Sequence, residues 1–197
     1  MQVQIAHNCV LLQYTFINTA ESQKITFLMI HKSIFHYLGR TEQKQHADTS
    51  PQQEVSLPLF MGRWYEQARY ENWFEAGMEN VHTDYSLSSK GWVNITNSGT
   101  NSNGTRTRSK GRGLPNGAGR LLVSFVPPYW WFQAPYHILY TDARYQGALI
   151  SGAGNDFLWL LTREAHPAAE LLEKLKEEAQ RRGFDTSRLR STCQSPD

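Results

Sequence analysis

The residues best suited to specific chemistry are a tryptophan and an arginine far apart in the chain. Trp64 follows Gly62 in the run GRWYEQARY, residues 62–70, and Arg163 ends the run FLWLLTR. A guanidinium can stack on an indole face and donate hydrogen bonds to nearby backbone carbonyls. Such a pair can close one end of a small β-barrel and leave the other end open onto an apolar cavity.

Patterns for covalent or metal chemistry are weak. Of the seven histidines, four precede residue 47, and the remaining three, His82, His137 and His166, have no nucleophile or metal-ligand spacing. The sequence has no glycine-rich phosphate loop and no nucleophile elbow around a serine. We therefore expect no catalytic residue, no metal site and no cofactor, and the net charge of +2 is too small to favour nucleic acid.

The elements that would position Trp64 and Arg163 are short strands with period two. Eight such segments are separated by Gly, Pro, Asn or Asp clusters, and they span residues 62–70, 80–87, 92–98, 105–113, 121–125, 136–142, 146–151 and 156–163. Eight strands joined by tight turns predict an all-β fold, an eight-stranded antiparallel up-and-down barrel. Within it, we expect a structural closed end formed by Gly62, Trp64, Thr141, Asp142, Tyr145 and Arg163.

One strand carries a row of basic side chains. Arg106, Arg108, Lys110 and Arg112 alternate with small residues, as expected for a barrel wall with charges outside and space inside. We interpret this row as a solvated strand face. Contact with anionic lipid head groups is the alternative.

The last strand is apolar on both faces and therefore needs cover on both. Pro167 suits the start of a helix and Gly183 its end. Between them, Leu171, Leu175 and Ala179 belong to an apolar stripe at helical spacing. We predict one C-terminal flanking α-helix over the last strand, followed by a short ninth strand at residues 183–189.

A ligand would enter at the end opposite Arg163. Turns at 71–77, 99–104, 126–135 and 151–156 fall there, so aromatic side chains should gather around the mouth; the alternative is that these rings fold back and cap the barrel. Any single inward residue could equally be plain core, but together they enclose an aromatic and aliphatic pocket. The predicted ligand-binding residues are Val81, Tyr85, Val93, Ile95, Phe125, Tyr129, Trp130, Trp131, Tyr136, Ile138, Tyr140 and Trp159.

The chain divides near residue 55. We expect residues 1–55 to be a poorly patterned N-terminal extension, either non-native or disordered and ending in a polar linker, and residues 56–197 to be the barrel domain. We expect no transmembrane helix, signal peptide or lipidation motif. Whether Cys9 and Cys193 pair stays open.

About two thirds of the chain, from Gly62 to Leu189, resembles the bacterial outer-membrane lipocalins of the Blc type. The matching residues are Gly62–Glu66, Gly77, Glu79–Val81, Tyr85, Arg120–Leu121, Val123–Phe125, Tyr136–His137, Thr141–Asp142, Tyr145, Asp156, Leu158–Trp159, Leu161, Arg163 and Gly183–Asp185. The resemblance implies a cell-envelope protein that binds fatty acids, lysophospholipids or similar amphiphiles. The sequence departs from the family at residues 126–135, where relatives tend to have a Phe/Gly-rich loop, and in its lack of a lipidation cysteine.

We therefore predict a non-enzymatic protein that stores or transports a fatty acid or lysophospholipid inside its barrel, in cell-envelope lipid handling. It would be a monomer or weak dimer with peripheral membrane contact. Two alternatives stay open. One is an envelope structural protein that grips a membrane or partner through the mouth aromatics, and the other is a barrel enzyme that acts on its lipid.

Overall fold

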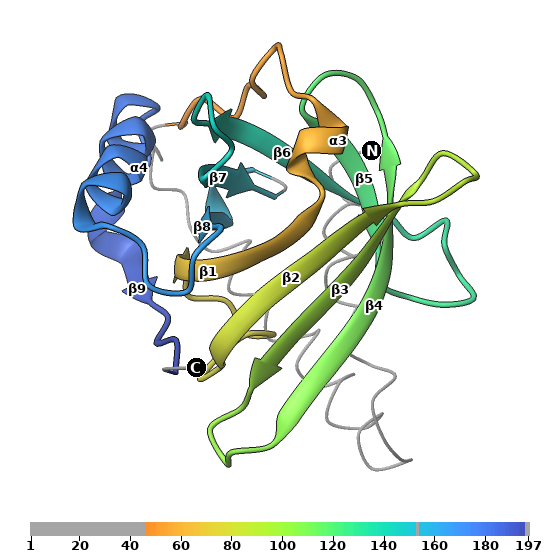
Figure 1. The fold of residues 1–197 in the computed structure, drawn as a ribbon, viewed down its shortest axis with the longest axis horizontal. Coiled ribbons are helices and arrows are strands. Elements are labelled where there is room, and N and C mark those ends of the chain that lie inside the picture. The colour runs from red at the N-terminus through yellow and green to blue at the C-terminus, as the bar shows by residue number, and fades with distance from the viewer. Residues whose placement is uncertain (1–45, 153, 196–197) are drawn as a thin grey trace, which may run out of the picture.

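The computed structural model describes residues 46–152 and 154–195. The strands are β1 (Gly62–Tyr70), β2 (Glu79–Leu87), β3 (Val93–Thr100), β4 (Arg106–Pro115), β5 (Arg120–Ser124), β6 (Ala134–Thr141), β7 (Gly147–Ser151), β8 (Leu158–Thr162) and β9 (Leu189–Ser191) (Figure 1). The helices are α3 (Leu57–Phe60) and α4 (Ala169–Arg181), with 3-10 turns η1 (Gly154–Asp156) and η2 (Thr186–Arg188).

Strands β1 to β8 form a closed antiparallel meander. Each strand pairs with the next, β8 pairs with β1, and residues 62–65 of β1 also pair with β2 to complete the barrel. The far end of β1, residues 68–70, instead pairs with β9. The predicted eight-stranded up-and-down barrel with one flanking helix is confirmed.

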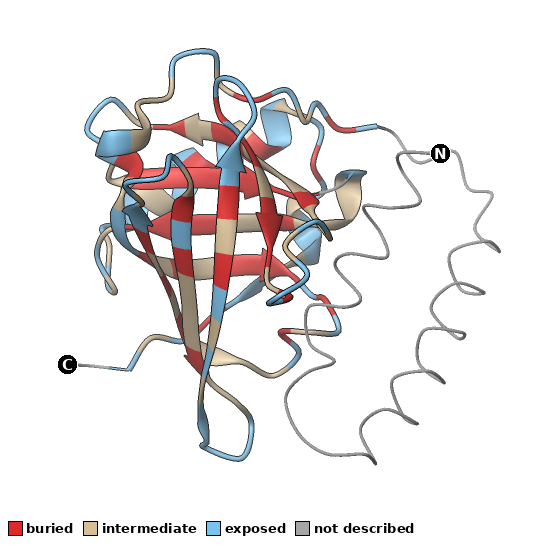
Figure 2. Ribbon diagram, turned by 90° about the vertical axis from the view of Figure 1, so that its right-hand side faces the viewer, coloured by how far each residue is buried: buried red, intermediate tan, exposed pale blue. Residues whose placement is uncertain are grey.

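Two apolar layers lie on either side of the barrel wall. The interior layer includes Trp64 and Leu161, and the outer layer, beneath α4, includes Ala68, Leu160 and Leu175. A β-bulge between Glu66 and Ala68 shifts the register of β1, so that residues beyond it change face. Figure 2 shows the buried positions alternating with less buried ones along the strands.

Helix α4 lies on the outer face of β7 and β8, as Figure 1 shows. Its buried residues are Leu175 and Ala179, from the predicted stripe. A Cβ on Gly147 would lie 2.9 Å from Leu171 Cδ1, so the missing side chain lets the helix approach the sheet. Gly183 ends this segment with φ +84°, a left-handed conformation that favours glycine.

Residues 46–55, which include the end of the predicted polar linker, lie along the barrel. Gln52 N donates to the Ile138 carbonyl at 3.0 Å in β6, and Asp48 N donates to the Arg182 carbonyl at 2.7 Å. Arg182 Nη1 in turn donates to the Ser50 carbonyl at 2.8 Å, and its Nη2 donates to the Leu139 carbonyl at 2.7 Å. We call residues 46–55 the strap, because they connect β6 to the end of α4.

The ninth strand begins later than predicted. Asp185 accepts a hydrogen bond from Ser187 N at 3.1 Å and caps η2, which delays the extended conformation until Leu189. The predictions for residues 1–45, including Cys9 and the absence of a signal peptide, lie outside the described residues. Among the helices of the described part, none is long and apolar enough to cross a membrane.

Candidate ligand-binding site

One end of the barrel is closed by Trp64 and Arg163. The Arg163 guanidinium lies 4.0 Å from the Trp64 ring centroid, and Trp64 Nε1 donates to the Phe60 carbonyl at 2.8 Å. Arg163 donates from Nε to the Tyr145 carbonyl at 3.2 Å, from Nη1 to the Arg63 carbonyl at 2.8 Å and from Nη2 to the Leu59 carbonyl at 2.7 Å. Partial burial lowers the pKa of Arg163, although guanidinium groups stay charged in proteins.

The other residues predicted for the closed end lie around this pair. A Cβ on Gly62, which has φ +96°, would lie 3.1 Å from Arg163 Nη1. Asp142 Oδ1 accepts from the backbone of Gln146 and Gly147 at 2.6 and 2.7 Å, and this holds the turn that presents the Tyr145 carbonyl. Thr141 N donates to Gln52 Oε1 at 2.7 Å and so contacts the strap.

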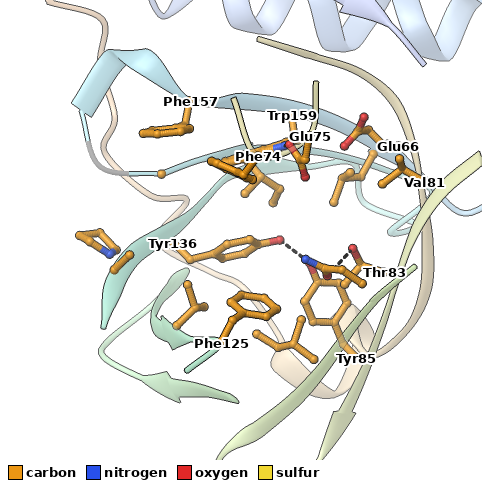
Figure 3. A pocket seen from close by; sticks show the side chains of 18 residues that line it. Glu66, Phe74, Glu75, Val81, Thr83, Tyr85, Phe125, Tyr136, Phe157 and Trp159 are labelled. Carbon is orange, nitrogen blue, oxygen red and sulfur yellow. Dashed lines mark hydrogen bonds between the residues drawn. The ribbon is translucent and has the colours of Figure 1, made fainter. Parts of the chain in front are cut away.

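A cavity lies between this closed end and the mouth. Its volume is about 90 Å³, and one water needs roughly 10–15 Å³. Of the predicted wall residues, Val81, Tyr85, Ile95, Phe125, Tyr136 and Trp159 line it. The further lining residues are Glu66, Phe74, Glu75, Thr83, Asn97, Val123, Ala134, Pro135, Ile150, Gly152, Phe157 and Leu161 (Figure 3).

Three predicted wall residues do not reach the cavity. Val93 and Ile138 are fully buried in the interior layer. Tyr140 packs against the outer layer, because the pairing of β6 with β7 shifts register between Ile138 and Tyr140. The prediction that Tyr140 lines the pocket is therefore wrong, because it assumed strict alternation of side chains along β6.

The aromatic residues of the mouth divide into two groups. Phe74 and Phe157, with ring centroids 5.9 Å apart, fold inward and line the cavity. Tyr129, Trp130 and Trp131, which were predicted to bind ligand, lie on the loop between β5 and β6 and outside the cavity lining. Trp131 and Tyr129 are 67% and 40% exposed and form an aromatic rim.

The predicted basic row lies outside the barrel, with Arg106, Arg108 and Lys110 exposed. Arg112 differs from these three, because its guanidinium lies 4.1 Å from the Trp130 ring and 4.5 Å from the Trp92 ring. The cation–π contact with Arg112 holds Trp130 against β4, outside the cavity lining.

A buried charge cluster at the mouth end was missed by the sequence analysis. Glu66, Arg69 and Glu75 are 2%, 0% and 8% exposed. Arg69 Nη1 donates to Glu66 Oε1 and to Thr192 Oγ1, and its Nη2 donates to the backbone carbonyls of Glu75 and Met78. The guanidinium thus ties the loop between β1 and β2 to the barrel.

Glu75 belongs to this cluster and also lines the cavity. Its Oε2 accepts from Asn72 Nδ2 at 2.6 Å and from Trp159 Nε1 at 3.0 Å. Burial raises the pKa of Glu75. Burial and the nearby charge of Glu75 raise the pKa of Glu66 to about 7, against the opposing effect of Arg69. The sequence did contain a signal for Glu66: it lies two residues after Trp64 in the same strand, so the alternation of side chains places both inside the barrel.

Two tyrosine hydroxyls meet across the cavity. Tyr85 Oη and Tyr136 Oη lie 2.7 Å apart and share a hydrogen bond. Burial raises the pKa of Tyr85 to about 12 and that of Tyr136 well above its ordinary value, so both are neutral hydrogen-bonding groups. Among the described residues, no group of three His, Cys, Asp or Glu side chains could hold a metal ion, and Cys193 is exposed.

Comparison with known sequences gives one family. The family model of the lipocalin-like domain matches residues 55–194. The chain is 35% identical over 134 residues to outer membrane lipoprotein Blc of Escherichia coli K12, covering 66% of this chain and 74% of that protein. It is also 35% identical over 151 residues to temperature-induced lipocalin-1 of Arabidopsis thaliana, covering 72% and 80%.

Solved structures share the fold at low sequence identity. Lobster apocrustacyanin A1 superposes with a TM-score of 0.61 at 20% identity, covering 80% of this chain and 94% of that one. Insecticyanin from the tobacco hornworm Manduca sexta gives a TM-score of 0.64 at 17% identity, covering 78% and 88%. These similarities establish the barrel architecture.

Proposed function

Because this chain belongs to the lipocalin-like family, we propose that it binds a single-chain amphiphile of the fatty acid or lysophospholipid class and carries it chemically unchanged. Lipocalins hold small hydrophobic ligands in their barrels. The observation that carries the proposal is the apolar cavity between the closed end at Arg163 and the mouth lined by Phe74 and Phe157. Similarity to outer membrane lipoproteins favours a role in cell-envelope lipid handling.

Burial of the tail would supply the affinity. A chain of about sixteen methylene groups contributes roughly 13 kcal/mol at about 0.8 kcal/mol per group. Association subtracts at least about 4 kcal/mol for lost translational and rotational freedom. The remainder, at most about 9 kcal/mol, corresponds to an affinity in the micromolar range.

Titration of the full chain with oleate and with a lysophospholipid tests this function. Tryptophan fluorescence should change saturably, because Trp159 lines the cavity, and native mass spectrometry should show one ligand per barrel. Val123→Phe should weaken binding, since Val123 lines the cavity. The matched control Leu114→Phe, on the exposed side of β4, should not. No bound mass and no saturable change with either ligand would refute the proposal.

The aromatic rim favours a supporting role at a lipid surface. Tyr129 and Trp131 are exposed beside the mouth, and aromatic rings of this kind partition to membrane interfaces. We propose that the rim makes peripheral contact with a membrane during loading, by a monomer or weak dimer. Trp131→Ala should reduce sedimentation of the protein with phosphatidylglycerol vesicles and leave its affinity for soluble oleate unchanged. If sedimentation of the variant equals that of the wild type, the rim does not make the membrane contact.

A further inference from the structure

The cavity has carboxylates in its wall without a matching free cation. Glu66 and Glu75 line it, and none of its described lining residues is Lys, Arg or His. The neighbouring Arg69 does not line the cavity, and both of its Nη atoms donate to Glu66, Thr192 and two backbone carbonyls, while its buried Nε has no partner among the described residues. The guanidinium therefore pairs with the Glu66 carboxylate and not with that of Glu75, and neither Nη is free to receive an anionic head group.

Glu75 also has an unused acceptor. Both of its side-chain hydrogen bonds end on Oε2, from Asn72 and Trp159, and Oε1 accepts none from the described residues. The side chain is only 8% exposed, and Figure 3 shows it at the cavity together with Trp159 and Tyr136. A buried carboxylate oxygen that faces an apolar space needs a hydrogen-bond donor.

We propose, building on the function proposed above, that Glu75 is the head-group site of the cavity and selects amphiphiles whose heads donate hydrogen bonds, with ammonium heads bound most tightly and carboxylate heads least. An ammonium beside Oε1 would balance the second carboxylate. A hydroxyl head would supply the donor without the charge. A carboxylate head would bring another acceptor and another negative charge to the same place.

The elevated pKa of Glu75 agrees with this assignment. Burial raises that pKa against the opposing effects of the hydrogen bonds from Asn72 and Trp159 and of the charge of Arg69. A bound ammonium would favour the ionised form. The asparagine and indole donors on Oε2 would hold the carboxylate in place.

The test compares three ligands that share a twelve-carbon tail: dodecylammonium, dodecan-1-ol and dodecanoate. Each is titrated into the full chain at pH 8, the two ionic ligands below their micelle concentrations and the alcohol below its solubility limit, with tryptophan fluorescence as the readout. Dodecylammonium should bind at least about tenfold more tightly than dodecanoate, the effect of roughly one charge-assisted hydrogen bond. The net charge of +2 would favour the anion, so overall attraction cannot produce this preference.

Glu75→Gln separates the head-group site from the cavity as a whole. The glutamine carbonyl can still accept from Asn72 and Trp159, but the charge is lost. The preference should fall below about threefold. The control Glu170→Gln, on the exposed first turn of α4, should keep the wild-type preference. Melting temperatures of both variants show whether they fold, and if Glu75→Gln does not, the order of the three ligands on the wild type still decides.

Each outcome has a distinct meaning. If dodecanoate binds the wild type as tightly as dodecylammonium, or folded Glu75→Gln keeps the preference, the head-group assignment is wrong while the lipid-binding function stands. If none of the three ligands, nor oleate, nor the lysophospholipid binds the wild type, the proposed function itself fails.

Discussion

Replacement of Arg163 by alanine should destabilise the barrel without emptying it. The side chain makes three hydrogen bonds to backbone carbonyls and one contact with the Trp64 ring. Water can reach these carbonyls once the side chain is removed, so each bond is worth about 1 kcal/mol rather than its fully buried value. The cation–π contact adds about 1 kcal/mol.

The sum for Arg163→Ala is about 4 kcal/mol, which corresponds to a fall of about 8–16 °C in melting temperature for a domain of this size. The Kd for oleate at 20 °C should stay within about threefold, because Arg163 lies outside the cavity lining. Arg163→Lys should recover only part of the loss, since an ammonium cannot serve three carbonyls in a fixed fork. The control Arg144→Ala removes an exposed arginine from the adjacent turn and should change the melting temperature little.

Thermal unfolding followed by circular dichroism, with ligand titration on the same samples, tests this reasoning. A fall of less than about 4 °C, no more than the shift expected from about 1 kcal/mol, would show that the contacts at the closed end contribute little. A large loss of affinity at unchanged stability would mean that Arg163 contacts the ligand and is not a structural plug.

Two further predictions concern the interior. Glu66 has a folded-state pKa of about 7, raised above its ordinary 4.5, so between these values the folded protein holds a proton that the unfolded chain releases; the contribution of Glu66 to stability should therefore be fully present below about pH 4.5 and be lost as the pH rises through 7. Urea unfolding of the wild type and of Glu66→Gln from pH 5 to 8 isolates this contribution from that of His82 and His137, whose lowered pKa values act in the opposite direction; a stability difference between the two proteins that does not change with pH would contradict it. A Cβ on Gly111 would lie 2.7 Å from the Phe125 ring and 2.8 Å from the Ser124 carbonyl, so Gly111→Ala should cost about 1–3 kcal/mol and also weaken oleate binding, because Phe125 must move within the cavity wall. Chemical denaturation would measure the loss of stability and titration the loss of oleate affinity. If neither changes, the barrel wall accommodates the added methyl group without displacing Phe125 at any cost.

Alternation along the strands was enough to predict the barrel, since each wall residue faces either the interior layer or the outer one. It also brought Trp64 and Arg163 to the same end, because both positions follow from the direction of the meander. The pattern failed at the bulges, where one extra residue changes the face of everything beyond it. Tyr140 was assigned to the wrong face for this reason. The bulge after Glu66 likewise made the ion pair between Arg69 and the Glu66 carboxylate impossible to predict from alternation.

The loop between β1 and β2 could not be predicted from the sequence. Its conformation depends on Arg69, which binds the backbone carbonyls of Glu75 and Met78, and on Trp159, which reaches it from β8. These contacts join distant parts of the chain and leave no periodic signal. A charged residue in a polar loop is usually solvated, so nothing in the local sequence distinguished Glu75 from an exposed glutamate.

The strap has a mechanical consequence. A pull on the chain at residue 46 is first resisted where Asp48 and Ser50 are bonded to Arg182, and next where Gln52 is bonded to β6. The load therefore enters the barrel through the end of α4 and the middle of β6, and it reaches β1 only after these bonds have parted. A tether attached ahead of residue 46 would thus strain the wall beside the helix, while the cation–π contact at the closed end and the loop that carries Glu75 would stay unloaded until the strap had peeled away.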